Sequence, residues 1–149
     1  MRAVVQRVSR ASVSVNENEV GSINTGLMVL LGLYKDDTDR DTDYIINKIL
    51  GLRIFDDENG VMNRSIEDIS GELLIISQFT LYGDARKGKR PSYSDAMPPL
   101  EAEEFYRSFL DTLKKRYVNV AEGIFGADMH VSLVNNGPVT ILLDSSRLF

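Results

Sequence analysis

Two segments that are typical of buried strands constrain the fold of this chain more than any other feature: residues 26–33, which are continuously apolar, and residues 72–81, which have polar residues late in the run. A strand that is apolar on both faces belongs inside a sheet that is covered on each side. Residues 2–9 and residues 11–15 instead alternate between apolar and polar side chains, which is typical of strands with one buried face. The sequence therefore predicts a sheet with at least two central and two half-buried strands.

Two further segments have helical periodicity. The first reaches about Leu50 and follows a cluster of aspartates, which favour the positive end of a helix dipole. That cluster lacks the ligand spacing of a calcium loop, so helix capping is the better interpretation. Pro98 and Pro99 precede the second helix, which ends in basic residues. Its apolar stripe consists of Ala102, Phe105, Tyr106, Phe109, Leu113 and Tyr117.

Turn signals and short strands account for the remaining residues. We expect hairpins at residues 16–19 and 56–60, where Asn, Asp, Glu and Gly gather, and a loop over residues 83–99. Closing strands are expected at residues 119–124, 129–134 and 139–144. Strands outnumber helices, so the predicted fold class is α/β, a single β-rich layered domain (α/β/β) over residues 1–149 with two main helices packed on sheets.

Composition excludes several classes of function. The chain has no cysteine, which rules out disulfides, zinc-thiolate sites and thiol catalysis and suits a reducing cytoplasm. Residues 26–34 form the longest apolar region, which is too short to span a bilayer. The net charge of −5 disfavours broad nucleic-acid binding, although a local patch is enough to bind a short nucleic-acid end.

Side-chain chemistry is sparse. The only histidine, His130, falls on the polar face of a predicted strand, so a catalytic triad is disfavoured. Carboxylates occur only at helix starts and turns, and no phosphate-binding glycine motif is present, so neither a metal nor a cofactor is expected.

The remaining candidates for a functional site are hydroxyl, amide and backbone groups, which gather at two places in the sequence. Ser77, Gln78, Phe79 and Thr80 occupy a predicted strand end, where backbone N–H groups can form an oxyanion hole or the hydroxyls can cap neighbouring carbonyls. Thr80 is a possible nucleophile but has no evident base. Gly137-Pro138 either makes a tight turn or presents two rigid carbonyls to a pocket.

Two more segments have both a functional and a structural interpretation. Small residues flank Phe125 in residues 123–129, which can form a flat slot for an aromatic ring such as adenine or a β-bulge. Four cations occur within residues 86–90, and they form either a solvated loop or a phosphate contact.

Taken together, these segments resemble motifs of a known protein family. The chain resembles the D-aminoacyl-tRNA deacylases of the bacterial and eukaryotic type along essentially its whole length. The resemblance rests on five motifs in order: Met1-Arg2-Ala3-Val4-Val5-Gln6-Arg7-Val8, Ser77-Gln78-Phe79-Thr80-Leu81-Tyr82, Arg86-Lys87-Gly88-Lys89-Arg90-Pro91-Ser92, Gly123-Ile124-Phe125-Gly126-Ala127-Asp128-Met129 and Asn136-Gly137-Pro138-Val139-Thr140.

We expect a cytoplasmic protein from the apolar pattern of the chain. The resemblance implies a homodimer whose sheets meet at the interface and whose active sites lie there. Family members hydrolyse the ester that joins a D-amino acid, or glycine, to the 3′ end of tRNA. Gly137-Pro138 would be cis, held by Arg7 and inserted into the partner's pocket, where it leaves no room for an L side chain. Asn136 stands where many members have aspartate, which puts the rigidity and pH dependence of this motif in question.

The resemblance also implies roles for the other motifs. Residues Ser77 to Thr80 would line the carbonyl site, with the N–H groups of Phe79 and Thr80 stabilising the oxyanion. The adenosine slot would consist of Phe125, Gly126, Ala127 and Met129. Our own candidates for phosphate contacts are Arg86, Lys87, Lys89 and Arg90. Two alternatives stay open: a non-catalytic module that binds a nucleotide or RNA end, and an esterase that depends on Thr80.

Overall fold

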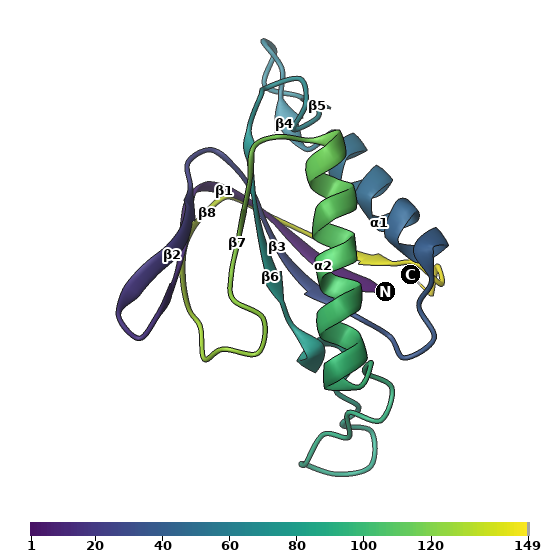
Figure 1. Cartoon of the computed structure of the whole chain (residues 1–149). Coiled ribbons are helices and arrows are strands. Elements are labelled where there is room, and N and C mark those ends of the chain that lie inside the picture. The colour runs from purple at the N-terminus through teal and green to yellow at the C-terminus, as the bar shows by residue number, and fades with distance from the viewer. Residues whose placement is uncertain (149) are drawn as a thin grey trace.

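A curled sheet with two helices on one face forms the architecture of the computed structural model, which describes residues 1–148 (Figure 1). The elements in chain order are β1 (Arg2–Val15), β2 (Asn18–Ile23), β3 (Gly26–Gly32), α1 (Asp39–Gly51), β4 (Phe55–Asp56), β5 (Met62–Arg64), β6 (Glu72–Ser77), the 3₁₀ helix η1 (Phe79–Tyr82), α2 (Pro99–Arg116), β7 (Val120–Glu122) and β8 (His130–Asp144). None of the helices in the described part of the chain is long and apolar enough to cross a membrane.

Strand β1 organises the six-stranded sheet. It pairs antiparallel with β3 and β2 along one side and with β8 along the other, while β3, β6 and β7 run parallel to one another. The sheet curls until β2 approaches β7: a Cβ atom placed on Gly21 would lie 2.8 Å from the carbonyl oxygen of Glu122. The predicted α/β class is thus confirmed, with a mixed sheet that nearly closes into a barrel.

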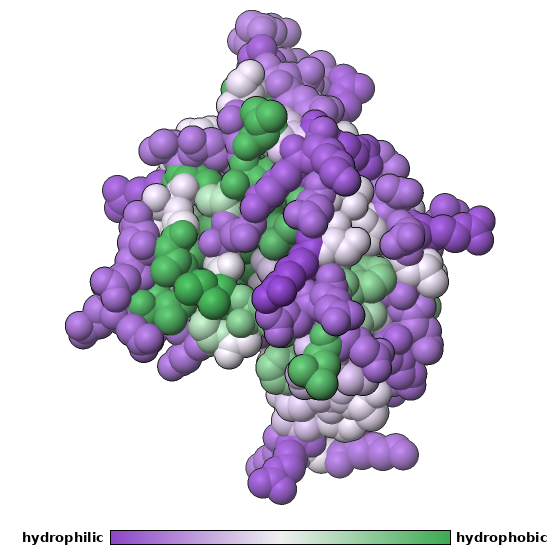
Figure 2. All heavy atoms as spheres, viewed as in Figure 1, coloured by the Kyte–Doolittle hydropathy of each residue, from purple (hydrophilic) through white to green (hydrophobic). Residues whose placement is uncertain are grey.

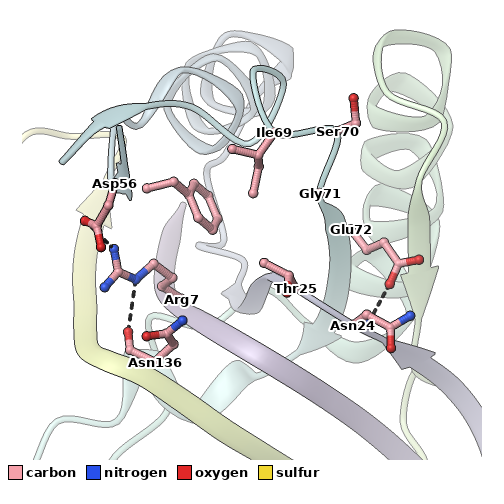
Figure 3. Close-up of a pocket in the computed structure, with 10 residues that line it drawn as sticks. Arg7, Asn24, Thr25, Asp56, Ile69, Ser70, Gly71, Glu72 and Asn136 are labelled. Atoms are coloured by element: carbon pink, nitrogen blue, oxygen red, sulfur yellow. Dashed lines mark hydrogen bonds and ion pairs between the residues drawn. The ribbon is translucent and has the colours of Figure 1, made fainter. Parts of the chain in front are cut away.

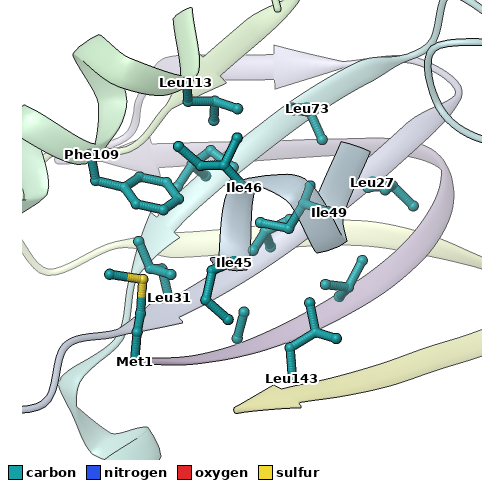
Figure 4. Close-up of a cluster of buried hydrophobic side chains, with 14 of the residues drawn as sticks. Met1, Leu27, Leu31, Ile45, Ile46, Ile49, Leu73, Phe109, Leu113 and Leu143 are labelled. Atoms are coloured by element: carbon teal, nitrogen blue, oxygen red, sulfur yellow. The ribbon is translucent and has the colours of Figure 1, made fainter. Parts of the chain in front are cut away.

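The curl divides the core into two clusters. The larger cluster lies between the helices and the sheet, where Ile45, Ile49 and Phe109 cover the side chains of Leu27 and Leu31 (Figure 4). The smaller cluster lies on the other side of the same strands and consists of Val8, Ala11, Val13, Ile23, Met28, Leu74 and Ile76. Both faces of β3 and β6 are therefore buried, which explains the apolar residues that make up β3 and the middle of β6.

The two helices begin and end close to the predicted positions. In the first turn of α1, the carboxylate of Asp41 accepts hydrogen bonds from the N–H (2.8 Å) and the hydroxyl (2.9 Å) of Thr38, which caps the helix. In α2, Pro99 occupies the first helical position, where its missing N–H costs nothing, and Arg116 is in the basic last turn. Local sequence signals are thus sufficient to position both helices.

Three predicted strand boundaries are wrong. The two strands expected at residues 2–9 and 11–15 are one strand, β1, because β8 pairs with it along nearly its whole length. The strand expected over residues 72–81 ends at Ser77, because its partner β3 ends at Gly32 and no further ladder is available. The two strands expected at residues 129–134 and 139–144 are one strand, β8, because β1 pairs with both halves of it. Residues Asn136 to Val139 bulge out between these halves, so the tight-turn interpretation of Gly137-Pro138 is wrong as well.

Candidate functional site

The 3₁₀ turn η1 follows directly after the buried strand β6. Its N-terminus is held by the Gln78 N–H, which donates to the Leu31 carbonyl at 2.7 Å, and its first internal bond runs from the Leu81 N–H to the Gln78 carbonyl at 3.3 Å. The N–H groups of Phe79 and Thr80 precede that bond and donate to no acceptor among residues 1–148. Two adjacent free N–H groups at a helix start form a site suited to a negatively charged oxygen.

The side chains around η1 offer no general base. The amide nitrogen of Gln78 donates to the Thr80 hydroxyl oxygen at 2.5 Å, and an amide does not take up a proton at neutral pH. His130 is exposed on β8, as its place in the sequence pattern predicted. Within the described residues, no three His, Asp or Glu side chains come close enough together to hold a metal ion.

A cavity of about 630 Å³ brings two of the predicted residue groups together. Its walls include Ser77, Gln78 and Phe79 from the end of β6 and Phe125, Gly126, Ala127 and Met129 from the loop after β7. The side chain of Thr80, the second residue of η1, is exposed and does not line this cavity. Apolar side chains gather around β7 and the loop that follows it, between β2 and α2 (Figure 2).

The loop after β7 is fixed against the core. The Phe125 ring lies 5.6 Å from the ring of buried Tyr106, between their centroids. Gly126 has a φ of +73°, which lets the chain turn back toward β8. A Cβ atom on Gly123 would lie 2.5 Å from the sulfur of Met129, so glycine allows that side chain to pack against the turn. The wall of the cavity is therefore preformed.

Sequence patterns missed the opposite wall of this cavity. It is formed by residues of the segment before α2 and of its first turn: Tyr93, Ala96, Met97, Pro98, Pro99 and Ala102. Ala102 was assigned to the apolar stripe of the helix, and it does also pack in the core. No local signal separates a small apolar residue that lines a pocket from one that only packs.

Arg7 and Gly137-Pro138 form a second constellation. The peptide bond between Gly137 and Pro138 is cis, and Gly137 has a φ of +129°. Arg7 is buried and donates to the Asn136 carbonyl at 3.0 Å (Figure 3). It also donates to the Ile54 carbonyl at 2.7 Å.

The same guanidinium lies 3.2 Å from an Asp56 carboxylate oxygen. A Cβ atom on Gly137 would lie 3.1 Å from Nη2 of Arg7. Arg7 therefore links β1, the β4–β5 hairpin and the bulge of β8.

Within one chain, the residues around η1 lie far from Arg7 and Gly137-Pro138. Arg7 pairs with Leu27, which pairs with Leu73, whereas Ala3 pairs with Leu31, which pairs with Ser77. Four residues of strand correspond to about 13 Å along the sheet, and β1 and β3 separate β8 from β6 as well. A separate cavity of about 460 Å³, lined in part by Arg7, Asn136 and Glu72, lies beside Arg7 (Figure 3).

The cationic loop projects from the N-terminal end of α2 (Figure 1). Its base is an isolated β-bridge between Asp84 and Ser92. The Asp84 N–H donates to the Ser92 carbonyl at 2.8 Å, and the Ser92 N–H donates to the Asp84 carbonyl at 2.9 Å. The Arg86 guanidinium donates to both Asp84 carboxylate oxygens, at 2.9 and 2.7 Å, and lowers the pKa of Asp84 to about 2. Lys87, Lys89 and Arg90 are exposed and form no salt bridge with any described residue.

Comparisons with known proteins agree with one another. The family model described as D-Tyr-tRNA(Tyr) deacylase matches residues 4–144. D-aminoacyl-tRNA deacylases of Thermosipho africanus and Clostridioides difficile are each 58% identical to this chain over 149 residues, which is 100% of either protein. The corresponding protein of Thermotoga petrophila is 56% identical, again over 100% of both chains.

Solved structures have the same fold. The structure of a c-Myc DNA Unwinding Element Binding Protein superimposes with a TM-score of 0.92 at 46% identity, covering 97% of this chain and 98% of that one. A probable eukaryotic D-amino acid tRNA deacylase shares the fold with a TM-score of 0.82 at 18% identity, covering 95% and 97%. By sequence and by fold, the chain belongs to the D-Tyr-tRNA(Tyr) deacylase family, whose curated members are hydrolases named D-aminoacyl-tRNA deacylases.

Proposed function

We propose that this protein hydrolyses the ester bond of D-aminoacyl-tRNA in the cytoplasm and releases the free D-amino acid and tRNA. The observation that carries the proposal is the pair of free N–H groups of Phe79 and Thr80, which lies beside an apolar cavity in a chain of this family. A planar apolar slot suits a nucleobase, and the N–H pair suits the oxygen of a tetrahedral intermediate.

In this mechanism the terminal adenosine occupies the slot formed by Phe125, Gly126, Ala127 and Met129. The ester carbonyl oxygen points at the N–H groups of Phe79 and Thr80, and water attacks the carbonyl carbon. The bond to the ribose 3′ oxygen then breaks, and that oxygen receives a proton. Because the site lacks a side-chain base, we assign the proton transfer to water assisted by the neighbouring 2′-hydroxyl of the RNA.

The chirality filter in this mechanism is the backbone of Gly137-Pro138, supplied by a second copy of the chain. The distance between this motif and η1 within one chain supports the proposal, because a site that uses both needs two subunits. The two carbonyls face the α-carbon and leave space for hydrogen or a D side chain. Backbone cannot yield to an L side chain, whereas a binding pocket discriminates one methyl group by only about 1–3 kcal/mol.

A filter that acts by exclusion also admits glycine, which has no side chain to exclude. We therefore include glycyl-tRNA, in particular glycine mischarged on tRNA-Ala, among the substrates. Ala-tRNA with its L-methyl group should be rejected by the same wall. The protein thus acts in translation quality control, and recognition of the acceptor end alone is compatible with the net charge of −5.

The direct test compares hydrolysis of D-tyrosyl-tRNA and L-tyrosyl-tRNA by the purified protein, with a chelator present. We expect rapid release of tyrosine from the D-ester and no release from the L-ester above the spontaneous rate. Equal inertness toward both esters would favour a non-catalytic module that binds an RNA end. The 46% identical c-Myc DNA Unwinding Element Binding Protein is named for binding rather than for catalysis, which is the observation that favours this alternative.

An esterase that depends on Thr80 is the second alternative. Thr80→Val removes the hydroxyl but keeps the backbone N–H, so the proposed mechanism predicts turnover close to that of the unmodified protein. A loss as large as that expected for a missing nucleophile, together with trapping of an acyl group on Thr80, would establish the covalent route instead.

A further inference from the structure

An exposed aromatic pair lies at the rim of the apolar cavity. Phe79 is 58% exposed and Tyr93 is 39% exposed, although both are large apolar rings that proteins normally cover. The ring centroids are 5.1 Å apart in an edge-to-face arrangement, and both residues line the cavity. Together they present an exposed apolar surface in the same cavity as the residues of the adenosine slot, and we call them the Phe79–Tyr93 pair.

The chain holds this pair in position. Tyr93 follows directly after the bridge between Asp84 and Ser92, whose two hydrogen bonds fix the base of the loop. A Cβ atom on Gly83 would lie 3.0 Å from Cε1 of Tyr93, so the ring packs closely against backbone. Phe79 belongs to η1, which is anchored to β3 through Gln78 and Leu31. A preformed surface loses little conformational freedom when a ligand binds.

Charge favours an anionic partner for this surface. The loop beside Tyr93 contains four cations, of which Arg86 is paired with Asp84. Lys87, Lys89 and Arg90 have no acidic partner among the described residues. Aromatic side chains next to free cations are the usual combination for binding single-stranded nucleic acid, where bases stack on the rings and phosphates face the cations.

We propose that the Phe79–Tyr93 pair binds the nucleobase that precedes the terminal adenosine, and that the loop cations contact the phosphate between the two nucleotides. This second subsite rests on the proposed function, because it requires adenosine in the neighbouring slot. The enzyme then reads a single-stranded dinucleotide end rather than one nucleoside, which supplies binding energy remote from the ester.

The test measures the affinity of two non-hydrolysable probes for the intact protein. The mononucleotide probe is 3′-amino-3′-deoxyadenosine with D-tyrosine in amide linkage, and the dinucleotide probe carries an additional cytidine on its 5′ side. Because stacking on an aromatic side chain is worth about 1–3 kcal/mol per base, we expect the dinucleotide to bind about tenfold more tightly. Tyr93→Leu should remove this gain, so that the two probes bind the variant with similar affinity, whereas Tyr93→Phe should keep the gain.

Two controls separate the base from the phosphate and the site from the rest of the surface. A dinucleotide probe with an abasic first residue should bind like the mononucleotide, apart from a salt-dependent part that Lys87→Gln and Lys89→Gln reduce. Tyr44→Leu removes an aromatic ring on α1 that does not line the cavity, so it should leave both affinities unchanged.

The outcomes separate the second subsite from the proposed function. A mononucleotide that binds with no further gain from cytidine, or a gain that survives in Tyr93→Leu, overturns the second subsite and leaves the proposed function intact. Failure of both probes to bind the unmodified protein overturns the proposed function and the subsite with it.

Discussion

Gly137 is the residue that we expect to tolerate change least. A Cβ atom there would lie 2.7 Å from Cγ2 of Val139 and 3.1 Å from Nη2 of Arg7, and the φ of +129° is unfavourable for any L side chain. Gly137→Ala should therefore displace the motif and lower kcat/KM toward D-tyrosyl-tRNA by about a hundredfold, since misplacement by about 1 Å has effects of that size.

Gly60→Ala is the matched control for that substitution. Gly60 also has a positive φ, +73°, but no heavy atom lies within 4 Å of its Cβ position. We expect this variant to lose about 1 kcal/mol in the free energy of unfolding and to keep its activity. Gly137→Ala with unchanged activity toward the D-ester would contradict the assigned position of the motif.

Arg7 should not be replaceable by lysine. Its Nε and Nη1 donate to the Asn136 and Ile54 carbonyls from one planar group, and a lysine ammonium cannot reproduce this fork. We expect Arg7→Lys to lower the free energy of unfolding by about 1–3 kcal/mol, since a buried acceptor loses its donor. It should also increase L-ester hydrolysis relative to D-ester hydrolysis.

The control is Arg53→Lys, because Arg53 donates from Nε to the Asn63 carbonyl at 2.8 Å but is exposed. Equal effects of the two substitutions on stability and on selectivity would show that burial of Arg7 has no special role. Denaturant unfolding and paired D- and L-ester assays make the comparison.

At the scale of elements, the helices could be predicted closely but η1 could not. Thr38, Pro99 and the basic end of α2 are local signals that need no tertiary information. The strand β6 ends because β3 ends and Gly32 allows η1 to pack there, and neither fact is visible in residues 72–81 alone. The bulge in β8 likewise depends on the register against β1, which only the folded sheet defines.

Gly32 should control the position of η1. A Cβ atom there would lie 3.0 Å from the Gln78 carbonyl oxygen and 3.0 Å from Cβ of Leu81. Gly32→Ala should push η1 away and misalign its N–H groups, so we expect kcat to fall by about tenfold or more while KM changes little. Gly51→Ala, whose Cβ position has no neighbour within 4 Å, should leave both constants unchanged. A rise in KM with constant kcat would mean that η1 stabilises the bound substrate and the transition state equally.

The pKa of the Asp84 carboxyl reports the conformation of the cationic loop. Arg86 stabilises ionised Asp84, which lowers the pKa of that carboxyl to about 2. A lowered pKa means that the contact is fully formed above the usual aspartate pKa and is lost as the pH falls through about 2. Arg86→Gln should raise the pKa of Asp84 toward its usual range, as NMR titration of the carboxyl carbon can measure. An unchanged pKa would show that the two side chains are not paired in solution.

At the scale of the whole molecule, the sequence predicts more of the fold class than of the assembled site. The continuously apolar runs identify β3 and β6 as central strands, and both are buried on two faces. The motifs of the site are recognisable from their residues as well. The distance between these motifs within one chain cannot be predicted from the sequence, because it follows from the strand register that places Arg7 beside Leu27 and Ser77 beside Leu31. That separation supports the proposal of a site shared by two copies.

Mixing two inactive variants tests this shared site most directly. Gly137→Ala disables the inserted motif and Phe125→Ala disables the slot, so a mixed dimer has one site with both parts unmodified. Random pairing makes half of the dimers mixed, and a shared site predicts recovery of about a quarter of the unmodified D-ester activity. Activity equal to the mean of the two separate variants would show that each chain builds its site alone, which would contradict a site shared by two copies.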